Sequence, residues 1–264
     1  YTPLSVTREA ARLVAPLLAD LGRGGTLFGL EPSAGIRRFV AAFPSVKWVA
    51  VEYAKLSVAI LAKLYPEAEV TNAAFESWVV SKSNAWAGRF SLVASNPPYG
   101  RRGAFEKIDP DPRYKESQAY LYFLRRGLDL LAPGGIGIYL IPYGFLTGRG
   151  ERYATQRERV LKRHHLLSAF RLPSALFPGG NLVTDLLFFQ ARGGEVASVV
   201  DEDRTIVDGD YYKLWPRHIL GTVVGSEEDE GTKKARRGYE IAGRFEGLPD
   251  PDFRPLCRTC RSEE

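Results

Sequence analysis

Apolar residues recur along the first 192 residues in two alternating patterns, one with the spacing of helices and one with that of strands. Between residues 7 and 21 they fall three or four positions apart, as on one face of a helix. The same spacing predicts helices over residues 35–43, 54–64, 118–131 and 151–162. Short apolar runs predict strands over residues 26–30, 47–51, 70–71, 90–94, 136–141, 166–172 and 182–190. This alternation favours an α/β fold with a doubly wound, mostly parallel sheet and helices on both faces.

The pattern changes after residue 192. Residues 193–264 are rich in glycine, proline and charge, with an acidic run over 227–230 and a basic run over 233–237. We therefore expect one domain over residues 1–192 and a small, irregular, loop-rich appendage over residues 193–264. The sequence starts at Tyr1 and has 0 methionines, so we expect it to be a piece of a larger protein.

Composition narrows the class of protein. The chain has 264 residues, 45% of them apolar, which is enough for one large domain or two small ones. It carries 36 Lys and Arg against 31 Asp and Glu, and this net charge of +5 permits a nucleic-acid partner without requiring one. We find neither a run of about 18 apolar residues nor a signal peptide, and therefore expect no membrane partner and a soluble, cytoplasmic protein.

Acidic residues follow the first two predicted strands. The first strand runs into Glu31-Pro32-Ser33-Ala34-Gly35, and the second ends at Glu52. In parallel sheets ligands bind beyond the carboxyl ends of the strands, and a carboxylate after the second strand can bind both hydroxyls of a ribose. This favours a cofactor that contains a nucleoside, although an acidic residue there is also often an ordinary helix cap. The G-x-G-x-x-G motif of NAD enzymes is absent.

The sharpest motif is Asn96-Pro97-Pro98-Tyr99, which follows the fourth predicted strand. Two prolines remove two N–H donors, so the nearby carbonyl groups can act as acceptors. The Asn96 side chain adds another acceptor, and Tyr99 adds a flat face for stacking. Such a site suits a planar substrate that bears an NH2 group.

Taken in this order, the motifs resemble those of S-adenosylmethionine-dependent DNA methyltransferases that modify adenine at N6, in the gamma arrangement. The resemblance implies the Rossmann-like fold of class I methyltransferases. It assigns Thr2 and Pro3 to the methionine end of the cofactor, Glu52 to its ribose and Phe75 to its adenine ring. All the residues that it assigns to the cofactor are Thr2, Pro3, Glu31, Pro32, Ala34, Gly35, Glu52, Phe75 and Asn96.

The same resemblance assigns catalysis to Asn96, Pro97, Pro98 and Tyr99, and stacking on the target base to Tyr99 and Phe177, the latter within Leu176-Phe177-Pro178. It implies methyl transfer to adenine in double-stranded DNA, with the base flipped out of the duplex and the methyl group passed directly in line. The resemblance also implies a role in restriction–modification or in phage or plasmid defence, and a protein encoded by a bacterium, phage or plasmid. Target recognition would come from further domains or subunits.

A narrower resemblance involves Arg171-Leu172-Pro173, residues 184–190, Tyr211-Tyr212, Pro216 and Leu220-Gly221. These are similar to the methylase domains of large phage- and plasmid-borne helicase–methylase proteins. The sequence departs from the general methyltransferase pattern at two positions. Arg37 occupies a position where a further glycine is usual, and Ala74 one where an acidic residue usually binds the adenine of the cofactor.

Several alternatives stay open at this point. Glu76 or backbone groups could replace the acid missing at Ala74, the cofactor could bind weakly, or activity could be lost. RNA adenine methyltransferases and protein glutamine N-methyltransferases share the Asn-Pro-Pro-Tyr chemistry. The alternative without enzyme activity is a catalytically impaired DNA-binding module of a larger complex.

Two further segments have a functional and a structural interpretation. Residues 101–117 carry five basic residues that could contact DNA phosphates or form an ordinary surface loop; they are Arg101, Arg102, Lys107, Arg113 and Lys115. Cys257-x-x-Cys260 is half of a zinc site, or two thiols without a ligand.

Overall fold

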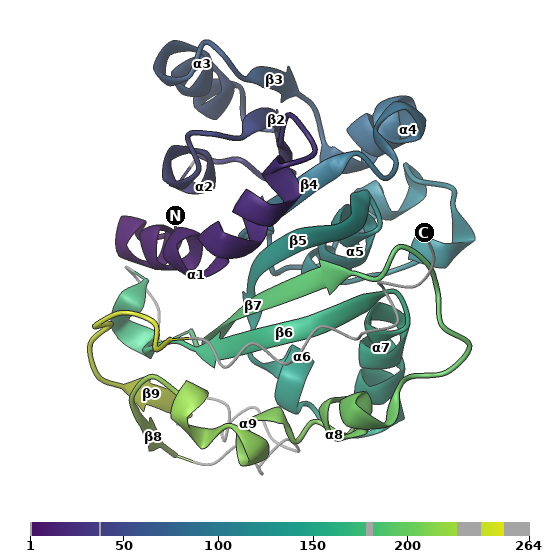
Figure 1. Ribbon diagram of the computed structural model, residues 1–264. Coiled ribbons are helices and arrows are strands. Elements are labelled where there is room, and N and C mark those ends of the chain that lie inside the picture. Colours follow the sequence, from purple (N-terminus) through teal and green to yellow (C-terminus); the bar gives the residue numbers. More distant parts are fainter. Residues whose placement is uncertain (1, 37, 178–181, 226–238, 251–264) are drawn as a thin grey trace.

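The computed structural model describes residues 2–36, 38–177, 182–225 and 239–250 (Figure 1). Seven strands form the main sheet. They are β1 (Phe28–Glu31), β2 (Lys47–Glu52), β3 (Glu69–Asn72), β4 (Phe90–Ser95), β5 (Leu131–Pro142), β6 (His164–Arg171) and β7 (Thr184–Ala191). A separate pair consists of β8 (Thr222–Val224) and β9 (Glu240–Ala242).

The helices alternate with the strands, as the apolar pattern predicts. They are α1 (Leu4–Gly22), α2 (Arg38–Ala42), α3 (Lys55–Leu64), α4 (Phe75–Trp86), α5 (Ala119–Leu128), α6 (Gly144–Thr147), α7 (Glu151–Leu161), α8 (Arg204–Val207) and α9 (Tyr211–Leu214). Short 3-10 helices lie at Gly103–Lys107, Pro112–Tyr114, Ser174–Leu176, Asp201–Asp203 and Pro216–His218. Among these described residues, no helix has the length and apolar character needed to cross a membrane.

The sheet has the order β3-β2-β1-β4-β5-β7-β6. Strands β1 to β5 pair in parallel, whereas β7 runs antiparallel between β5 and β6. The predicted doubly wound, mostly parallel sheet is therefore confirmed. Because β3, β2, β1 and β4 are parallel, their carboxyl ends meet at one edge of the sheet.

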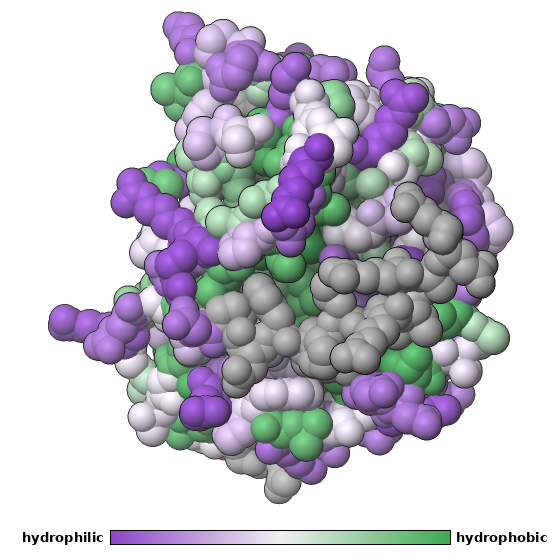
Figure 2. All heavy atoms as spheres, in the orientation of Figure 1, coloured by the Kyte–Doolittle hydropathy of each residue, from purple (hydrophilic) through white to green (hydrophobic). Residues whose placement is uncertain are grey.

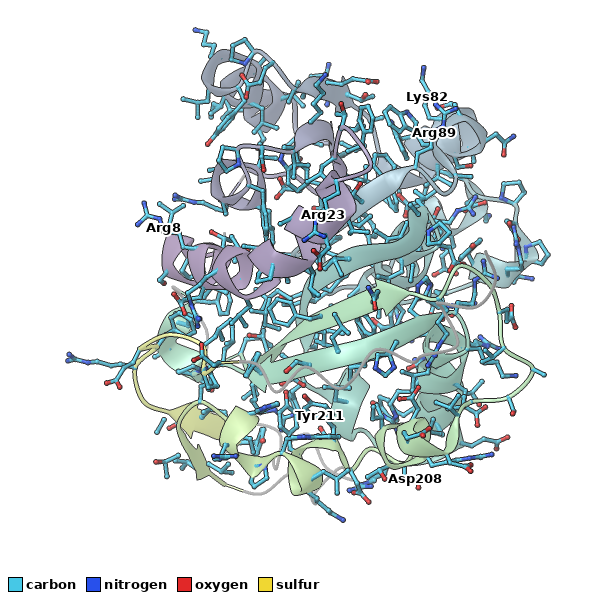
Figure 3. All side chains as sticks on the ribbon, in the orientation of Figure 1. Arg8, Arg23, Lys82, Arg89, Asp208 and Tyr211 are labelled. Atoms are coloured by element: carbon cyan, nitrogen blue, oxygen red, sulfur yellow. The ribbon has the colours of Figure 1, made fainter. Side chains whose placement is uncertain are left out.

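Two apolar cores cover the two faces of this sheet. One core includes Phe39 of α2 and the inner face of α1, and the other includes Trp78 of α4 and Leu124 of α5. Charged residues such as Arg8, Lys82 and Arg89 point outward (Figure 3). In Figure 2 hydrophilic side chains gather at the rim of the visible face, with apolar atoms between α1 and the strands. The two cores hold the turns at the sheet edge in fixed positions.

The described part of residues 193–250 lies against this sheet domain. Ile206, Val207, Tyr211 and Tyr212 are buried in the same core as α4 and α5. Tyr211 lies beside β6 (Figure 3), where its hydroxyl accepts a hydrogen bond of 2.8 Å from the Ala169 N–H. The segment thus shares the core of the sheet domain.

Three local predictions differ from the structure. Helix α4 is absent from the predicted elements, because its apolar residues are interrupted by serine, lysine and asparagine. The predicted helix over 118–131 ends at Leu128, and β5 begins at Leu131 instead of residue 136. The Pro-Gly-Gly sequence at 133–135 lies in a shift of register between Phe90 and Leu92 of β4, so it bulges the strand without ending it.

Candidate functional site

The motifs at the strand ends converge at one edge of the sheet. Glu31 ends β1, Glu52 ends β2, and Asn96 directly follows β4. The register pairs Glu31 with Ala50, and Leu30 with Val93, so the three ends lie side by side. The fold therefore brings together motifs that are 65 residues apart in the sequence.

Glu52 joins the first turn to the second strand. Its Oε2 accepts a hydrogen bond of 2.7 Å from the Gly35 N–H, and its Oε1 accepts one of 2.7 Å from the Ala54 N–H. Gly35 has φ of 53°, a conformation that favours glycine. Each carboxylate oxygen has two lone pairs and keeps capacity for another donor.

Asn96 has a fixed orientation. Its Nδ2 donates a hydrogen bond of 3.1 Å to Thr2 Oγ1, and its Oδ1 lies 2.7 Å from the Tyr99 hydroxyl. That hydroxyl has a second acceptor, the Leu140 carbonyl oxygen, at 3.2 Å. Burial raises the pKa of Tyr99 well above its ordinary value, so the hydroxyl remains a donor. The Asn96 oxygen consequently accepts one hydrogen bond from Tyr99 and keeps one lone pair for a second donor.

Two cavities adjoin along this edge. The first, of about 360 Å³, is lined by Thr2, Glu31, Ser33, Ala34, Gly35, Ile36, Arg38, Asn96, Pro97, Pro98 and Tyr99. The second, of about 320 Å³, is lined by Pro32, Ser33, Tyr53, Ala74, Phe75, Glu76, Pro98, Gly100, Arg101, Arg102, Phe105, Ala119 and Phe123. Because Ser33 and Pro98 line both, the cavities form one cleft across the ends of β1, β2 and β4.

Phe75 lies at the wall of the second cavity and is otherwise part of the core. Its side chain is 2% exposed, and its ring stacks on Trp78 at 6.0 Å between centroids and lies 5.0 Å from Phe123. It begins helix α4, which follows β3. The residue therefore offers at most an edge to a ligand in this cavity.

Pro3 and Phe177 stand apart from the other predicted residues. Pro3 precedes α1, with extended backbone angles and no side-chain hydrogen bond at the cap. Phe177 is partly buried against the core beneath α1. Neither is among the described residues that line the two cavities; Glu52 does not line them either, but it binds the N–H of Gly35, which does. Residues 178–181 after Phe177 lie outside the described part of the chain, as do Arg37, Cys257 and Cys260.

Sequence reasoning did not single out Arg38. The residue begins α2 and lines the first cavity. Its Nε is buried and has no hydrogen bond to any described residue. The side chain thus places a positive charge beside the turn at Gly35.

Residues 101–117, which we call the strap, differ from an ordinary basic loop. Arg102 is buried and forms an ion pair of 3.0 Å with Glu76, so it is not available to a phosphate. Arg113 pairs with Asp111 at 2.7 Å. Phe105 of the strap and Tyr53 meet edge to face at 5.6 Å across the second cavity. Only Tyr53 had a sequence signal, since it directly follows Glu52.

The described residues hold no group of three or more His, Cys, Asp or Glu side chains arranged for a metal ion. A zinc site at Cys257 and Cys260 remains a prediction from the sequence.

Comparison with known proteins agrees with this geometry. The family described as Eco57I restriction-modification methylase matches residues 48–177. The defense against restriction protein B of Escherichia phage P1 is 29% identical over 226 residues, 84% of this chain and 9% of that protein. The type I restriction enzyme EcoKI methylase subunit of Escherichia coli K12 is 29% identical over 117 residues, 44% of this chain and 21% of that subunit.

The fold has relatives of lower sequence identity. A putative class I S-adenosylmethionine-dependent methyltransferase from Listeria monocytogenes superposes with a TM-score of 0.57, at 16% identity, over 76% of this chain and 70% of that one. The chain spans about a tenth and a fifth of the two curated relatives named above, which are covered to 9% and 21%. It is thus similar in sequence to restriction–modification methylases and has the fold of class I S-adenosylmethionine-dependent methyltransferases, which confirms the resemblance inferred from its motifs.

Proposed function

We propose that this chain transfers a methyl group from S-adenosylmethionine to the N6 amino group of adenine in double-stranded DNA. The observation that carries the proposal is the fixed carboxamide of Asn96. Thr2 accepts from its nitrogen and Tyr99 donates to its oxygen, and both lie in the cleft next to the two prolines of the motif. Similarity to restriction–modification methylases supports DNA as the substrate.

The cleft fits the proposed cofactor. Its two cavities, of about 360 and 320 Å³, are each within the usual range of about 300–1,000 Å³ for small-molecule sites. Glu52 lies between the first turn and Tyr53, where its spare lone pairs can accept from the ribose hydroxyls. The rings of Tyr53 and Phe105 give the second cavity apolar walls suited to a purine.

The first cavity then receives the methionine half of the cofactor. Arg38 supplies a cation with a buried nitrogen that has no hydrogen bond to a described residue, and it would pair with the carboxylate of that half. Thr2 and Gly35 line the same cavity. This arrangement directs the sulfonium end of the cofactor toward Asn96.

The chain's own groups prepare the amine for reaction. The nitrogen of an adenine amino group is a weak nucleophile, because its lone pair is delocalised into the ring. Asn96 Oδ1 and the Pro97 carbonyl oxygen would each accept one of its hydrogens and direct the lone pair into the cleft. The bound cofactor would supply the methyl carbon, while the electron pair of its carbon–sulfur bond stays on sulfur. The extra proton on nitrogen then leaves to solvent.

An adenine can reach this site only outside the duplex, because the acceptors lie within a cleft. Flipping a base costs a few kcal/mol, and stacking on an aromatic face returns about 1–3 kcal/mol. Tyr99 lines the first cavity and is the first candidate for this stacking. Phe177 lies outside the lining of both cavities, so stacking on it would require a change in the position of its side chain.

Methyl transfer with separate measurement of cofactor binding tests the proposal. Labelled S-adenosylmethionine would be incubated with duplex DNA, RNA and a glutamine peptide, and the products analysed as nucleosides or amino acids. We expect N6-methyladenine in DNA. Asn96→Ala should lower the rate about 100- to 1,000-fold, as for loss of one preorganised transition-state contact. The Kd for S-adenosylhomocysteine should change less than about threefold, since Asn96 acts on the amine (one order of affinity is about 1.4 kcal/mol).

The other products decide between the alternatives. Label in RNA or in the glutamine peptide alone would replace the DNA assignment. Full activity of Asn96→Ala would contradict the mechanism. Cofactor binding without transfer to any of the three substrates would favour an impaired module, or a requirement for further domains or subunits that recognise the target.

A further inference from the structure

The second cavity contains a carboxylate, although Ala74 occupies the position where the resemblance expects an acid. Ala74, which stands at the usual position of the acid, caps α4 without a side-chain hydrogen bond. Glu76, two residues later, lines the same cavity and supplies the only carboxylate among its described lining residues. The cavity therefore retains an acceptor with a full negative charge.

Only half of the Glu76 carboxylate is engaged. Its Oε1 accepts a hydrogen bond of 3.0 Å from Arg102 Nε, and the side chains of Arg102 and Glu76 are 2% and 5% exposed. Its Oε2 has no hydrogen bond to any described residue. This oxygen is not among the fully buried polar atoms that lack a partner, so it is open to the cavity and can accept a hydrogen bond from a ligand that brings an N–H group.

Arg102 holds Glu76 in place from the strap. Its Nη1 donates to the Glu116 carbonyl at 3.0 Å and its Nη2 to the Phe105 carbonyl at 3.0 Å. Its guanidinium lies 3.6 Å above the ring of Tyr122. With all three nitrogens bonded, the arginine fixes the Glu76 carboxylate and the strap together. The open oxygen is thereby preorganised.

The rings around the cavity select a flat ligand. Phe105, whose carbonyl is bound by Arg102, faces Tyr53 at an interplanar angle of 88°. Tyr53 is 68% exposed and lies at the outer edge of the cavity. A planar ring bound against these aromatic side chains in the cavity would have its edge within reach of the first turn of α4, where Glu76 lies.

We infer that Glu76, positioned by Arg102, accepts a hydrogen bond from the amino group of the cofactor's adenine ring and so replaces the acid missing at position 74. The inference rests on the proposed use of an adenosyl cofactor. It makes Glu76 a determinant of cofactor specificity and the Glu76–Arg102 pair the link between adenine recognition and the strap. A ligand with an oxo group in place of the amino group would place its oxygen against the Glu76 carboxylate, and the two acceptors would repel each other.

Binding of two cofactor products tests this. The whole chain would be titrated calorimetrically with S-adenosylhomocysteine and with its inosine analogue, which carries the oxo group. We expect the parent to prefer the adenosyl compound by about 10- to 100-fold, as a charge-assisted hydrogen bond predicts. Glu76→Gln should lose most of this preference, because its amide can donate to the oxo group. Lys107→Ala, an exposed change in the same strap, should keep it.

A rescue experiment separates recognition from folding. Ala74→Asp combined with Glu76→Gln should restore the adenosyl preference by supplying the acid at its usual position. A parent that binds both compounds equally would overturn the inference, whether or not Glu76→Gln folds. So would a folded Glu76→Gln variant with unchanged preference. A parent that binds neither compound would instead contradict the proposed function itself.

Discussion

At the scale of single residues, the site depends on the orientation of one amide. An asparagine side chain can present either its oxygen or its nitrogen to a substrate, and only the oxygen can draw hydrogens from an amine. Thr2 accepts from the nitrogen and Tyr99 donates to the oxygen, so the oxygen of the amide lies on the Tyr99 side. Tyr99 therefore has a second task beside the stacking expected from its ring.

Removal of that hydroxyl gives a test at this scale. Tyr99→Phe keeps the ring but deletes the donor to Asn96, so the amide is held from one side only. We expect kcat to fall about 2- to 10-fold, the value of one net hydrogen bond, with the KM for the cofactor unchanged. Steady-state methyl transfer measures both quantities. An equal rise in cofactor KM without loss of kcat would contradict the positioning role.

The pH profile supplies the control for this variant. Burial raises the pKa of Tyr99 above its ordinary value of 10.0, so the donor remains protonated at all lower pH values. The parent and Tyr99→Phe should accordingly give profiles of the same shape between about pH 7 and 10. A rate loss in this range that Tyr99→Phe abolishes would show that the hydroxyl ionises there.

At the scale of elements, the sequence predicts strand ends better than the contacts between elements. Runs of apolar residues show where β1, β2 and β4 end, so Glu31, Glu52 and Asn96 could be placed at one edge. The burial of Arg102 could not be predicted, because a basic side chain enters a core only when a tertiary partner such as Glu76 meets it there. For the same reason the sequence did not predict that the strap forms a wall of the second cavity.

Two residues of the narrower resemblance to helicase–methylase proteins also connect secondary-structure elements. Arg171 of β6 binds both oxygens of Asp185 of β7, at 2.9 and 3.1 Å, and donates to the Tyr239 hydroxyl at 2.6 Å. Arg171 and Asp185 are 1% and 0% exposed. This pair connects the end of the sheet to the segment that carries β9.

Loss of one partner of this pair should be costly. Arg171→Ala leaves the Asp185 charge buried, and we expect the free energy of unfolding to fall by about 3–5 kcal/mol. The double variant Arg171→Met/Asp185→Leu removes both charges and should be less destabilised than Arg171→Ala. Urea unfolding at neutral pH measures the three values. A loss below about 1 kcal/mol in Arg171→Ala would show that the pair is not a structural connection.

At the scale of the whole molecule, the predicted domain boundary at residue 192 rests on composition alone. Composition separates residues 193–264 from the domain before them, but composition does not report contacts. Arg157 of α7 donates to the Val207 carbonyl at 2.8 Å, and Arg12 of α1 donates to the Leu248 carbonyl at 2.7 Å. The described part of this segment thus contacts both α1 and α7.

Truncation tests whether residues 1–192 fold without that segment. A chain that ends at residue 192 would expose the apolar surface now covered by Ile206, Val207, Tyr211 and Tyr212, all below 8% exposed. Each such side chain contributes about 1.5–3 kcal/mol, so their sum is comparable to the 5–15 kcal/mol of a typical domain. We expect this shorter chain to be insoluble or to melt far below the parent. A chain that ends at Asp250 keeps these contacts and should melt within a few degrees of the parent, as calorimetry would show. Equal melting temperatures for all three chains would establish residues 1–192 as an independent domain and reduce the contacts of Tyr211 and Arg157 to surface packing.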